Sequence, residues 1–272
     1  MQIQYQSPGI CVFQSALFQT TSTVIDTPDL VLIIDPNWLP EEVENIRHYV
    51  YNICKGRPLY LLFTHSDYDH IIAYNAFPGA RCIASEAFVN NPDPEATLQQ
   101  IRDFDDEYYI RRDYAIDYPV IDVIVKEDEQ IFQLGDTKLQ FWLAPGHNPD
   151  GIFTLVEPGN FFIAGDYLSN VEFPYIYHSS TAYESSLEKA DQIIMYQIPE
   201  LLIPGHGQVT DNPLDMHQRV LESEIYIQEL RKHLQAGTEF PVGDLWEKYY
   251  FPKIMTKFHE ENVALVLREL GL

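Results

Sequence analysis

Thr64-His65-Ser66-Asp67-Tyr68-Asp69-His70 places four potential metal ligands within six residues. The segment directly follows the apolar run Leu59-Tyr60-Leu61-Leu62-Phe63, which has the composition of a buried strand. Side chains alternate along an extended segment, so positions 65, 67 and 69 can project to one side. A helical turn that begins near His70 would bring this imidazole into the same space. Two imidazoles and two carboxylates at one strand end indicate a site for divalent metal.

Three further apolar runs end in a glycine that is followed by one potential ligand, which is His147, Asp166 or His206. A glycine at such a place lets the backbone approach closely or adopt a positive φ. Seven ligands are enough for two ions with open positions for water and substrate. The candidate metal ligands are therefore His65, Asp67, Asp69, His70, His147, Asp166 and His206.

Each of these elements has a simpler explanation when it is taken alone. A Gly-Asp pair after a strand is usually a turn, and an Asp-rich loop can cap a helix. The order of the four elements, each after an apolar run, is what favours a shared metal site. The remaining histidines lack such settings and are expected to be surface or structural residues: His48, His178, His217, His233 and His259.

These residues resemble the motifs of the metallo-β-lactamase-fold metallohydrolases. The family pattern is His-x-His-x-Asp-His, followed by a His, a bridging Asp and a final His. This sequence has His65-Ser66-Asp67-Tyr68-Asp69-His70, then His147, Asp166 and His206. The strand that ends in Asp35-Pro36 is also similar to the family's early strand and turn. The resemblance covers about residues 10–210 and implies an α+β fold, the four-layer αββα sandwich, with metals at one edge between two sheets.

The resemblance also implies a division of the ligands between two divalent ions, for which zinc is the expected metal. One ion is held by His65, Asp67 and His147, the other by Asp69, His70 and His206, and Asp166 is shared. Asp69 is the expected catalytic residue, because it would orient the attacking hydroxide and return a proton to the leaving group.

The sequence departs from the family pattern at Asp67, where a histidine is usual. A carboxylate is shorter than an imidazole, adds negative charge and is a harder ligand. Three alternatives stay open. Asp67 ligates directly and shifts the preference from zinc toward iron or manganese, or it is too short and leaves a single ion, or it orients a ligand without touching the metal. Flavodiiron proteins carry a Glu at the equivalent position and hold two irons, although this chain has no room for their flavodoxin-like domain.

The hydrophobic pattern predicts strands separated by helices, with a hairpin turn at Gly135-Asp136-Thr137-Lys138. The expected strands cover residues 11–13, 22–25, 30–34, 59–63, 81–84, 130–134, 139–143, 152–156 and 161–164. One expected helix begins at Pro40. The others cover residues 71–77, part of 92–108, 183–197, 214–236, 242–250 and 258–270.

The domain prediction is a metallo-β-lactamase-like domain over residues 1–210, with C-terminal helices over 211–272 packed on the same domain. Residues 86–118 are expected to be a helical insertion. It could act as a lid, form a dimer surface or pack as an ordinary peripheral helix on its own domain. The tyrosine-rich part, residues 90–118, is expected to line one wall of the pocket.

Composition limits the partners. The net charge of -24 over 272 residues opposes binding to nucleic acid and to anionic membranes, because both depend on basic residues. There is no apolar window of ~20 residues and no basic leader before an apolar block. Cys11, Cys54 and Cys82 are scattered and odd in number, which suits reduced thiols in a cytoplasm. The expected partner is a small-molecule substrate, with a homodimer as a further expectation.

The predicted function is that of a hydrolase in which a metal-bound hydroxide attacks an ester, thioester or lactone-like small molecule. Two alternatives remain, a di-iron oxidoreductase of flavodiiron-like site type and a non-catalytic metal-binding protein.

Overall fold

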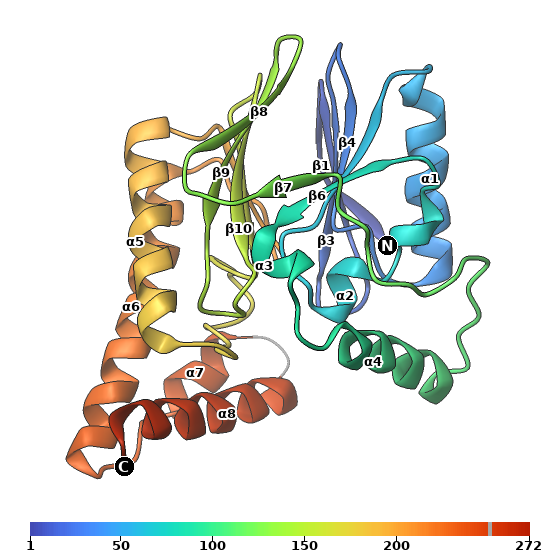
Figure 1. Cartoon of the computed structure of the whole chain (residues 1–272). Coiled ribbons are helices and arrows are strands. Elements are labelled where there is room, and N and C mark those ends of the chain that lie inside the picture. The colour runs from blue at the N-terminus through green and yellow to red at the C-terminus, as the bar shows by residue number, and fades with distance from the viewer. Residues whose placement is uncertain (250–251) are drawn as a thin grey trace.

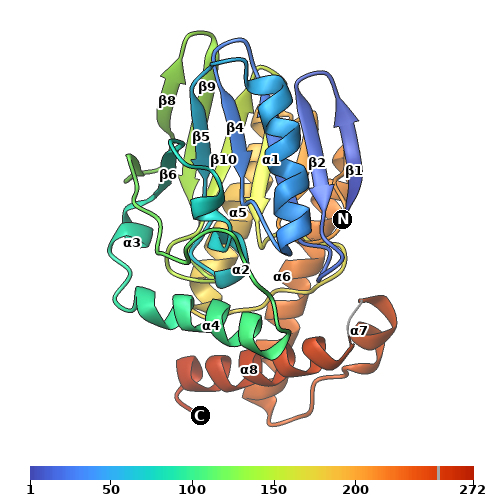
Figure 2. The same cartoon turned by 90° about the vertical axis from the view of Figure 1, so that its right-hand side faces the viewer.

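The computed structural model of the chain describes residues 1–249 and 252–272, and its strands form two sheets (Figures 1 and 2). The first sheet contains β1 (Gln2–Ser7), β2 (Ile10–Gln14), β3 (Thr21–Asp26), β4 (Val31–Ile34), β5 (Leu59–Leu62), β6 (Arg81–Ser85) and β7 (Val123–Val125), in this order. The second contains β8 (Gln130–Leu134), β9 (Thr137–Leu143), β10 (Ile152–Glu157), β11 (Phe161–Gly165) and β12 (Leu201–Pro204), in the order β12-β11-β10-β9-β8.

Helices cover the outer faces of the two sheets and the edge that they share (Figure 1). They are α1 (Pro40–Cys54), α2 (Tyr68–Ile71), α3 (Glu86–Val89), α4 (Pro94–Glu107), α5 (Ser180–Gln197), α6 (Pro213–Ala236), α7 (Gly243–Lys248) and α8 (Pro252–Leu270), with a 3-10 helix at Tyr74–Ala76. Helix α1 lies outside the first sheet, and α5 and α6 lie outside the second (Figure 1). None of the helices in the described residues is long and apolar enough to cross a membrane.

Three apolar clusters fill the spaces between the layers. The middle cluster lies between the sheets and includes Ile34, Leu62 and Ile163. A second cluster joins the first sheet to α1, through Val43, Ile46 and Val50 among others, and a third joins the second sheet to α5, α6 and α8. The expected αββα sandwich is therefore confirmed.

Parallel pairs of strands bring the ends of distant segments together. Strands β4 and β5 are parallel, with Ile34 opposite Leu62, and both are nearly all buried, as their uninterrupted apolar runs predict. Strands β11 and β12 are also parallel, with Gly165 opposite Pro204. Because the carboxyl ends of parallel strands meet at one edge, the residues after these four strands share that edge.

The predicted strands are all present, and the predicted hairpin turn joins β8 to β9. Strands β1 and β7 were not predicted, since β1 is mostly polar and β7 has three residues. The single helix predicted at 71–77 is instead two short helices, α2 and the 3-10 helix at Tyr74–Ala76. Helix α2 begins within the metal-ligand motif at Tyr68, where the Asp67 carbonyl accepts a hydrogen bond from the His70 amide at 3.0 Å.

Two C-terminal helices differ in length from their predictions. Helix α8 begins at Pro252 rather than at 258, because proline suits the first position of a helix. Helix α7 covers Gly243–Lys248, and Tyr250, the last residue of the predicted helix, lies outside the described residues.

The segment 86–118 packs on its own domain. Leu98 and Ile101 of α4 are buried, and the ring of Phe104 lies 4.9 Å from that of Trp38. Beyond α4, Arg112 bonds to Asp105 at 2.8 Å and to the Trp38 carbonyl at 2.7 Å. Of the three expected roles, the structure shows packing on the same domain.

Candidate metal centre

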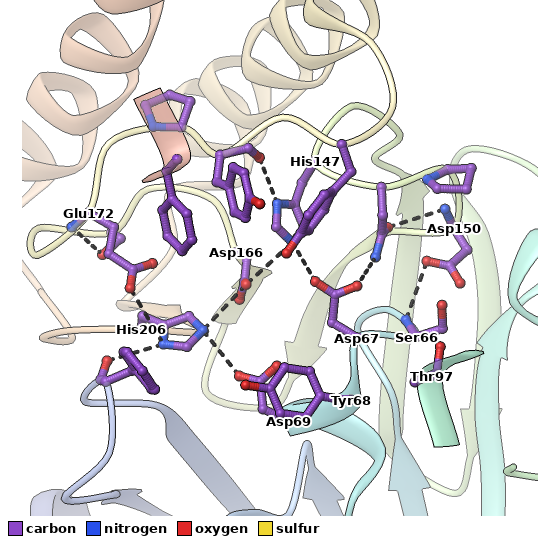
Figure 3. Close-up of a pocket in the computed structure, with 18 of the residues that line it drawn as sticks. Ser66, Asp67, Tyr68, Asp69, Thr97, His147, Asp150, Asp166, Glu172 and His206 are labelled. Atoms are coloured by element: carbon purple, nitrogen blue, oxygen red, sulfur yellow. Dashed lines mark hydrogen bonds and ion pairs between the residues drawn. The ribbon is translucent and has the colours of Figure 1, made fainter. Parts of the chain in front are cut away.

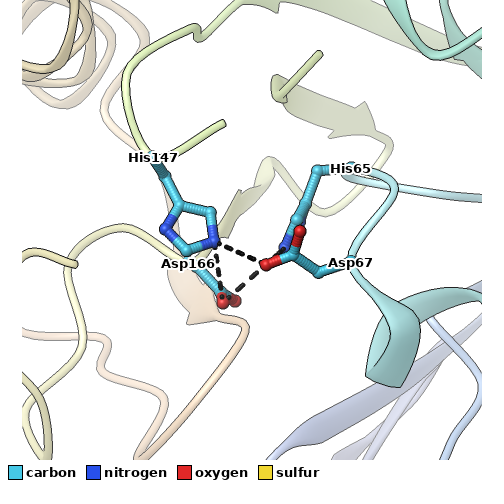
Figure 4. Close-up of side chains that lie close together, drawn as sticks. All are labelled: His65, Asp67, His147 and Asp166. Atoms are coloured by element: carbon cyan, nitrogen blue, oxygen red, sulfur yellow. Dashed lines mark hydrogen bonds and ion pairs between the residues drawn. The ribbon is translucent and has the colours of Figure 1, made fainter. Parts of the chain in front are cut away.

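All seven candidate ligands lie together at the shared edge of the two sheets. Figures 3 and 4 label six of them, all except His70. They come from the β5–α2 segment, the β9–β10 loop and the ends of β11 and β12. Within each of two groups the ligand atoms lie within 4.8 Å of one another. The first group is His65, Asp67, His147 and Asp166, and the second is Asp69, His70 and His206.

The carboxylate of Asp166 lies between the two groups, because it approaches all four imidazoles. The Asp166 oxygens lie 3.6 Å from His65 Nε2, 3.2 Å from His70 Nε2, 3.4 Å from His147 Nε2 and 3.3 Å from His206 Nε2. A single side chain thus connects the two groups into one site.

Each of the four imidazoles hydrogen-bonds through Nδ1 and turns Nε2 toward the site. The Nδ1 partners are Thr64 Oγ1 for His65 (2.9 Å), Asp35 Oδ2 for His70 (2.9 Å), the Tyr175 carbonyl for His147 (2.7 Å) and the Phe18 carbonyl for His206 (3.1 Å). Carbonyl and carboxylate oxygens only accept, and the Thr64 hydroxyl already donates its proton to Asp35, so Nδ1 donates in each ring. The lone pair of each ring is left on Nε2, as a metal ligand requires.

Several atoms that face the centre are buried without a hydrogen-bond partner among the described residues. They are His65 Nε2, His70 Nε2 and Asp166 Oδ1. A buried polar atom without a partner is costly, so such atoms in a native structure indicate an ion or water that binds them. Imidazole and carboxylate are ligands that suit zinc, iron and manganese, and this donor set fits divalent metal.

The charges in the site stabilise one another. Burial opposes ionisation of Asp67, yet hydrogen bonds with His147 and His65 hold the pKa of Asp67 well below its ordinary value. Burial also disfavours a charged His206, but Glu172 and Asp166 raise the pKa of His206 to about 10. Without metal, these carboxylates therefore favour a proton on His206. A divalent cation bound to this imidazole would replace that proton, so binding would release it.

Comparison with known proteins identifies the family. The sequence profile of the Metallo-beta-lactamase superfamily matches residues 16–206. The chain belongs to this superfamily. Among curated proteins, no sequence matches the chain.

Solved structures share the fold of this superfamily member. A metallo-beta-lactamase family protein from Thermus thermophilus is 17% identical, with a TM-score of 0.68 over 97% of this chain and 95% of that one. The sec-alkylsulfatase Pisa1 from Pseudomonas sp. is 13% identical, with a TM-score of 0.72 over 98% of this chain and 50% of that one. Rubredoxin oxygen:oxidoreductase from Desulfovibrio gigas is 15% identical, with a TM-score of 0.56 over 84% of this chain and 62% of that one.

Asp67, where a histidine was expected from the resemblance, belongs to the first group of ligands (Figure 4). Its Oδ2 lies 3.1 Å from His147 Nε2 and 3.7 Å from His65 Nε2. The other carboxylate oxygen accepts a hydrogen bond from Asn148 Nδ2 at 3.2 Å. Because the Asp67 carboxylate lies beside two ring nitrogens that face the site, direct ligation is favoured over a site with a single ion and over a role in which Asp67 only orients a ligand.

Asp35 is a residue of the site that sequence reasoning missed. Its Oδ2 accepts hydrogen bonds from His70 Nδ1 at 2.9 Å and from Thr64 Oγ1 at 2.6 Å, and its Oδ1 accepts from the Thr64 amide at 2.9 Å. Thr64 Oγ1 in turn accepts from His65. One carboxylate therefore orients both imidazoles of the motif. Its signal in the sequence was its place at the end of a buried strand, next to the strand that carries the motif.

The C-terminal helix α8 reaches the site indirectly. Asn262 is fully buried, and its side chain donates to the Pro174 carbonyl at 2.6 Å and accepts from the Ile176 amide at 2.8 Å. These bonds hold the backbone on both sides of Tyr175, whose carbonyl orients His147.

Gly205 allows Asp166 to take its central position. A Cβ at residue 205 would lie 2.2 Å from Asp166 Oδ1 and 3.1 Å from the Gly165 carbonyl oxygen. We expect Gly205→Ala to displace this carboxylate and to weaken zinc binding by about 10- to 100-fold, the range seen when residues that orient ligands are changed. Competition with a chelating dye measures this affinity.

Gly243→Ala is the matched control, because a Cβ at residue 243 meets nothing within 4 Å. An unchanged zinc affinity in Gly205→Ala would show that the position of Asp166 is unimportant.

A pocket of about 470 Å³ opens over the two groups of ligands (Figure 3). The insertion lines one wall, as expected, through Asn91, Ala96 and Thr97 among others. The lining tyrosines, however, come from outside residues 90–118. They are Tyr68, Tyr175, Tyr177 and Tyr183. Tyrosines 108, 109, 114 and 118 of the insertion are not among the lining residues, because the segment turns its helix α4 toward the pocket.

Proposed function

We propose that this superfamily member is a metal-dependent hydrolase that acts on an ester, thioester or lactone-like small molecule. The observation that carries this proposal is the convergence of four imidazole Nε2 atoms and three carboxylates at the base of a pocket. Hydrolases among its structural neighbours, such as the sec-alkylsulfatase, support the reaction type. The acidic net charge of -24 favours a small molecule over nucleic acid as the partner.

The proposed ligands of the first ion are His65, Asp67 and His147, those of the second are Asp69, His70 and His206, and Asp166 is shared. Divalent ions bound there would lower the pKa of water to ~7 and polarise a carbonyl oxygen. Zinc is the proposed metal, with iron or manganese as alternatives because the Asp67 carboxylate is a harder ligand than imidazole.

Asp69 is the proposed carrier of the proton. Burial, together with the charges of Asp166 and Asp67, raises the pKa of Asp69, which suits a group that takes up and returns a proton. Its Oδ2 lies 3.4 Å from His70 Nε2 and 3.5 Å from His206 Nε2. The oxygen of water adds to the acyl carbon, the acyl–oxygen bond breaks, and the proton passes through Asp69 to the leaving alcohol.

A second candidate function is a di-iron oxidoreductase. The carboxylate at position 67 and the fold shared with rubredoxin oxygen:oxidoreductase favour it. Iron in the purified protein, with a visible absorption band, would support this candidate, whereas zinc would support the hydrolase. A protein that binds metal without turnover of any substrate would be a binding protein.

Removal of metal is expected to abolish hydrolysis and to lower the melting temperature. A ligand present at a hundredfold excess over its Kd stabilises the fold by about 2.7 kcal/mol, which corresponds to about 5–10 °C for a chain of this size. Dialysis against EDTA, followed by calorimetry and an activity assay, measures both effects. Addition of zinc is the control and should restore both, whereas full activity after complete removal of metal would contradict the proposal.

The substrate class is tested with a matched panel of ester, thioester, lactone and phosphodiester compounds, each assayed with zinc-, iron- and manganese-loaded protein. We expect turnover of at least one carbonyl compound with zinc. Turnover of the phosphodiester alone, or of nothing with any metal, would overturn the proposal.

A further inference from the structure

Glu172 carries a carboxylate into the pocket, and among the described residues no lysine or arginine pairs with it. It lies between β11 and α5, and its side chain is only 13% exposed. Its nearest charged neighbour is His206, with Oε1 4.0 Å from Nδ1 (Figure 3). That nitrogen donates to the Phe18 carbonyl at 3.1 Å instead. Within the described residues, no hydrogen-bond donor satisfies this carboxylate, although it is largely withdrawn from water.

Aromatic rings line the same pocket as Glu172. Tyr175 stacks on Phe258 with ring centroids 3.7 Å apart and also contacts Tyr177 at 4.2 Å. Tyr177 lies 5.0 Å from the ring of His147. Such faces attract cations and apolar groups, and they offer little to an anion.

Among the described residues that line the pocket, Lys257 is the lone lysine or arginine. Its side chain is 60% exposed, and Nζ lies 3.8 Å from Glu261. A second anionic group on a substrate, such as a carboxylate or phosphate, would therefore meet Glu172 and aromatic rings rather than a basic clamp. The charge of the pocket away from the proposed metals opposes anions.

We infer that the site selects substrates that carry a protonated amine close to the ester or thioester carbonyl, with an apolar or aromatic body. This inference rests on the proposed hydrolase. The ammonium donates to Glu172, and the body lies against Tyr175, Tyr177 and Phe258. The Glu172 carboxylate lies 4.0 Å from the imidazole of His206, which belongs to the second group of ligands. An amine a few bonds from the reacting carbon can therefore reach this carboxylate while the carbonyl lies at the proposed metals.

The test compares three esters that differ in one group. Phenylalanine methyl ester carries the amine, methyl 3-phenylpropanoate lacks it, and the monomethyl ester of benzylmalonic acid has a carboxylate in its place. We expect the amine ester to have the highest kcat/KM and the anionic ester the lowest. The preference for the amine over the neutral ester should be about 10- to 100-fold, the contribution of a hydrogen bond to a charged group.

Glu172→Gln keeps the shape of the side chain and removes its charge. In this variant the ratio of kcat/KM between the amine and neutral esters should fall to near one, mainly through KM, while two metal ions stay bound. Glu157→Gln is the control, because it removes one charge from a half-exposed side chain that pairs with Lys138. A ratio that stays at the wild-type value in Glu172→Gln would overturn the inference. If Glu172→Gln lost its metal ions as well as its preference for the amine ester, the inference would also be overturned, since Glu172 would then act by holding His206.

Binding separates this inference from the hydrolase itself. If the wild-type protein hydrolyses none of the esters, calorimetry compares phenylalaninol with 3-phenylpropanol, which lacks the amine. Tighter binding of phenylalaninol that is lost in Glu172→Gln would support the inference although the proposed reaction had failed. Equal binding of the two alcohols would overturn it.

Discussion

Asp166→Ala is expected to remove both metal ions and to reduce turnover by about a thousandfold or more, because bound metal supplies several kcal/mol of catalysis. The physical reason is the central place of this carboxylate, whose oxygens lie 3.2 to 3.6 Å from all four imidazoles. Without it, each group loses a negative ligand, and four imidazoles face one another with less compensating charge. Elemental analysis of the purified variant, together with kcat/KM, measures the effect.

Asp191→Ala is the matched control for Asp166→Ala. It removes a carboxylate that pairs with His217 on the outer helices, where the Asp191 side chain is 37% exposed. Its metal content and turnover should equal those of the wild-type protein. Circular dichroism should be unchanged in both variants, since Asp166 lies at the end of β11 and outside the apolar clusters. Two bound ions in Asp166→Ala would contradict the shared role of this residue.

Asp69→Asn is expected to lower kcat by about 10²- to 10⁴-fold, the usual contribution of a group that transfers a proton. Asparagine keeps one oxygen near His70 and His206 but cannot accept the proton of the attacking water. Metal in the first group, with His65 and His147, should be retained, while the second ion binds more weakly. Metal titration and steady-state kinetics on the same preparation separate these effects. Full kcat in a variant that holds its metals would remove Asp69 from the proton path.

Much of the fold was predictable from short segments of the sequence. The uninterrupted apolar runs of β4, β5, β11 and β12 predict buried strands. A polar residue or a glycine follows β4, β11 and β12, and the run of β5 continues through Phe63 to Thr64. The structure brings His147, Asp166 and His206 to the 65–70 motif because these strand ends lie at one edge. The motif residues are adjacent to the strands that place them, so local patterns were sufficient to suggest their meeting.

Residues that act through long-range contacts were not predictable in this way. Asp35 reaches His70 only because β4 and β5 pair in parallel, and nothing near Asp35 in the sequence identifies this partner. The Tyr175 carbonyl, which orients His147, is a backbone atom in an irregular segment and leaves no pattern of residue types. Glu172, Tyr175 and Tyr177 lie in the same irregular segment, whereas Tyr68 lies in the motif and Tyr183 in α5. The tyrosine-rich insertion drew attention by composition alone.

The start of α2 shows how one misplaced boundary changes a site. An extended strand through position 69 predicts that 65, 67 and 69 share one side. In the structure the chain is already helical at Tyr68, so Asp69 and His70 turn into the second group, whereas His65 and Asp67 stay with the first. Two separate groups follow from this change of backbone within the motif.

The central claim is that the seven side chains hold two metal ions that share Asp166. Anomalous diffraction at the zinc absorption edge from crystals of the zinc-loaded protein tests it most directly. We predict two peaks next to the Asp166 carboxylate, one within reach of His65, Asp67 and His147, and one within reach of Asp69, His70 and His206. Zinc bound elsewhere, with neither of these positions occupied, would contradict the account.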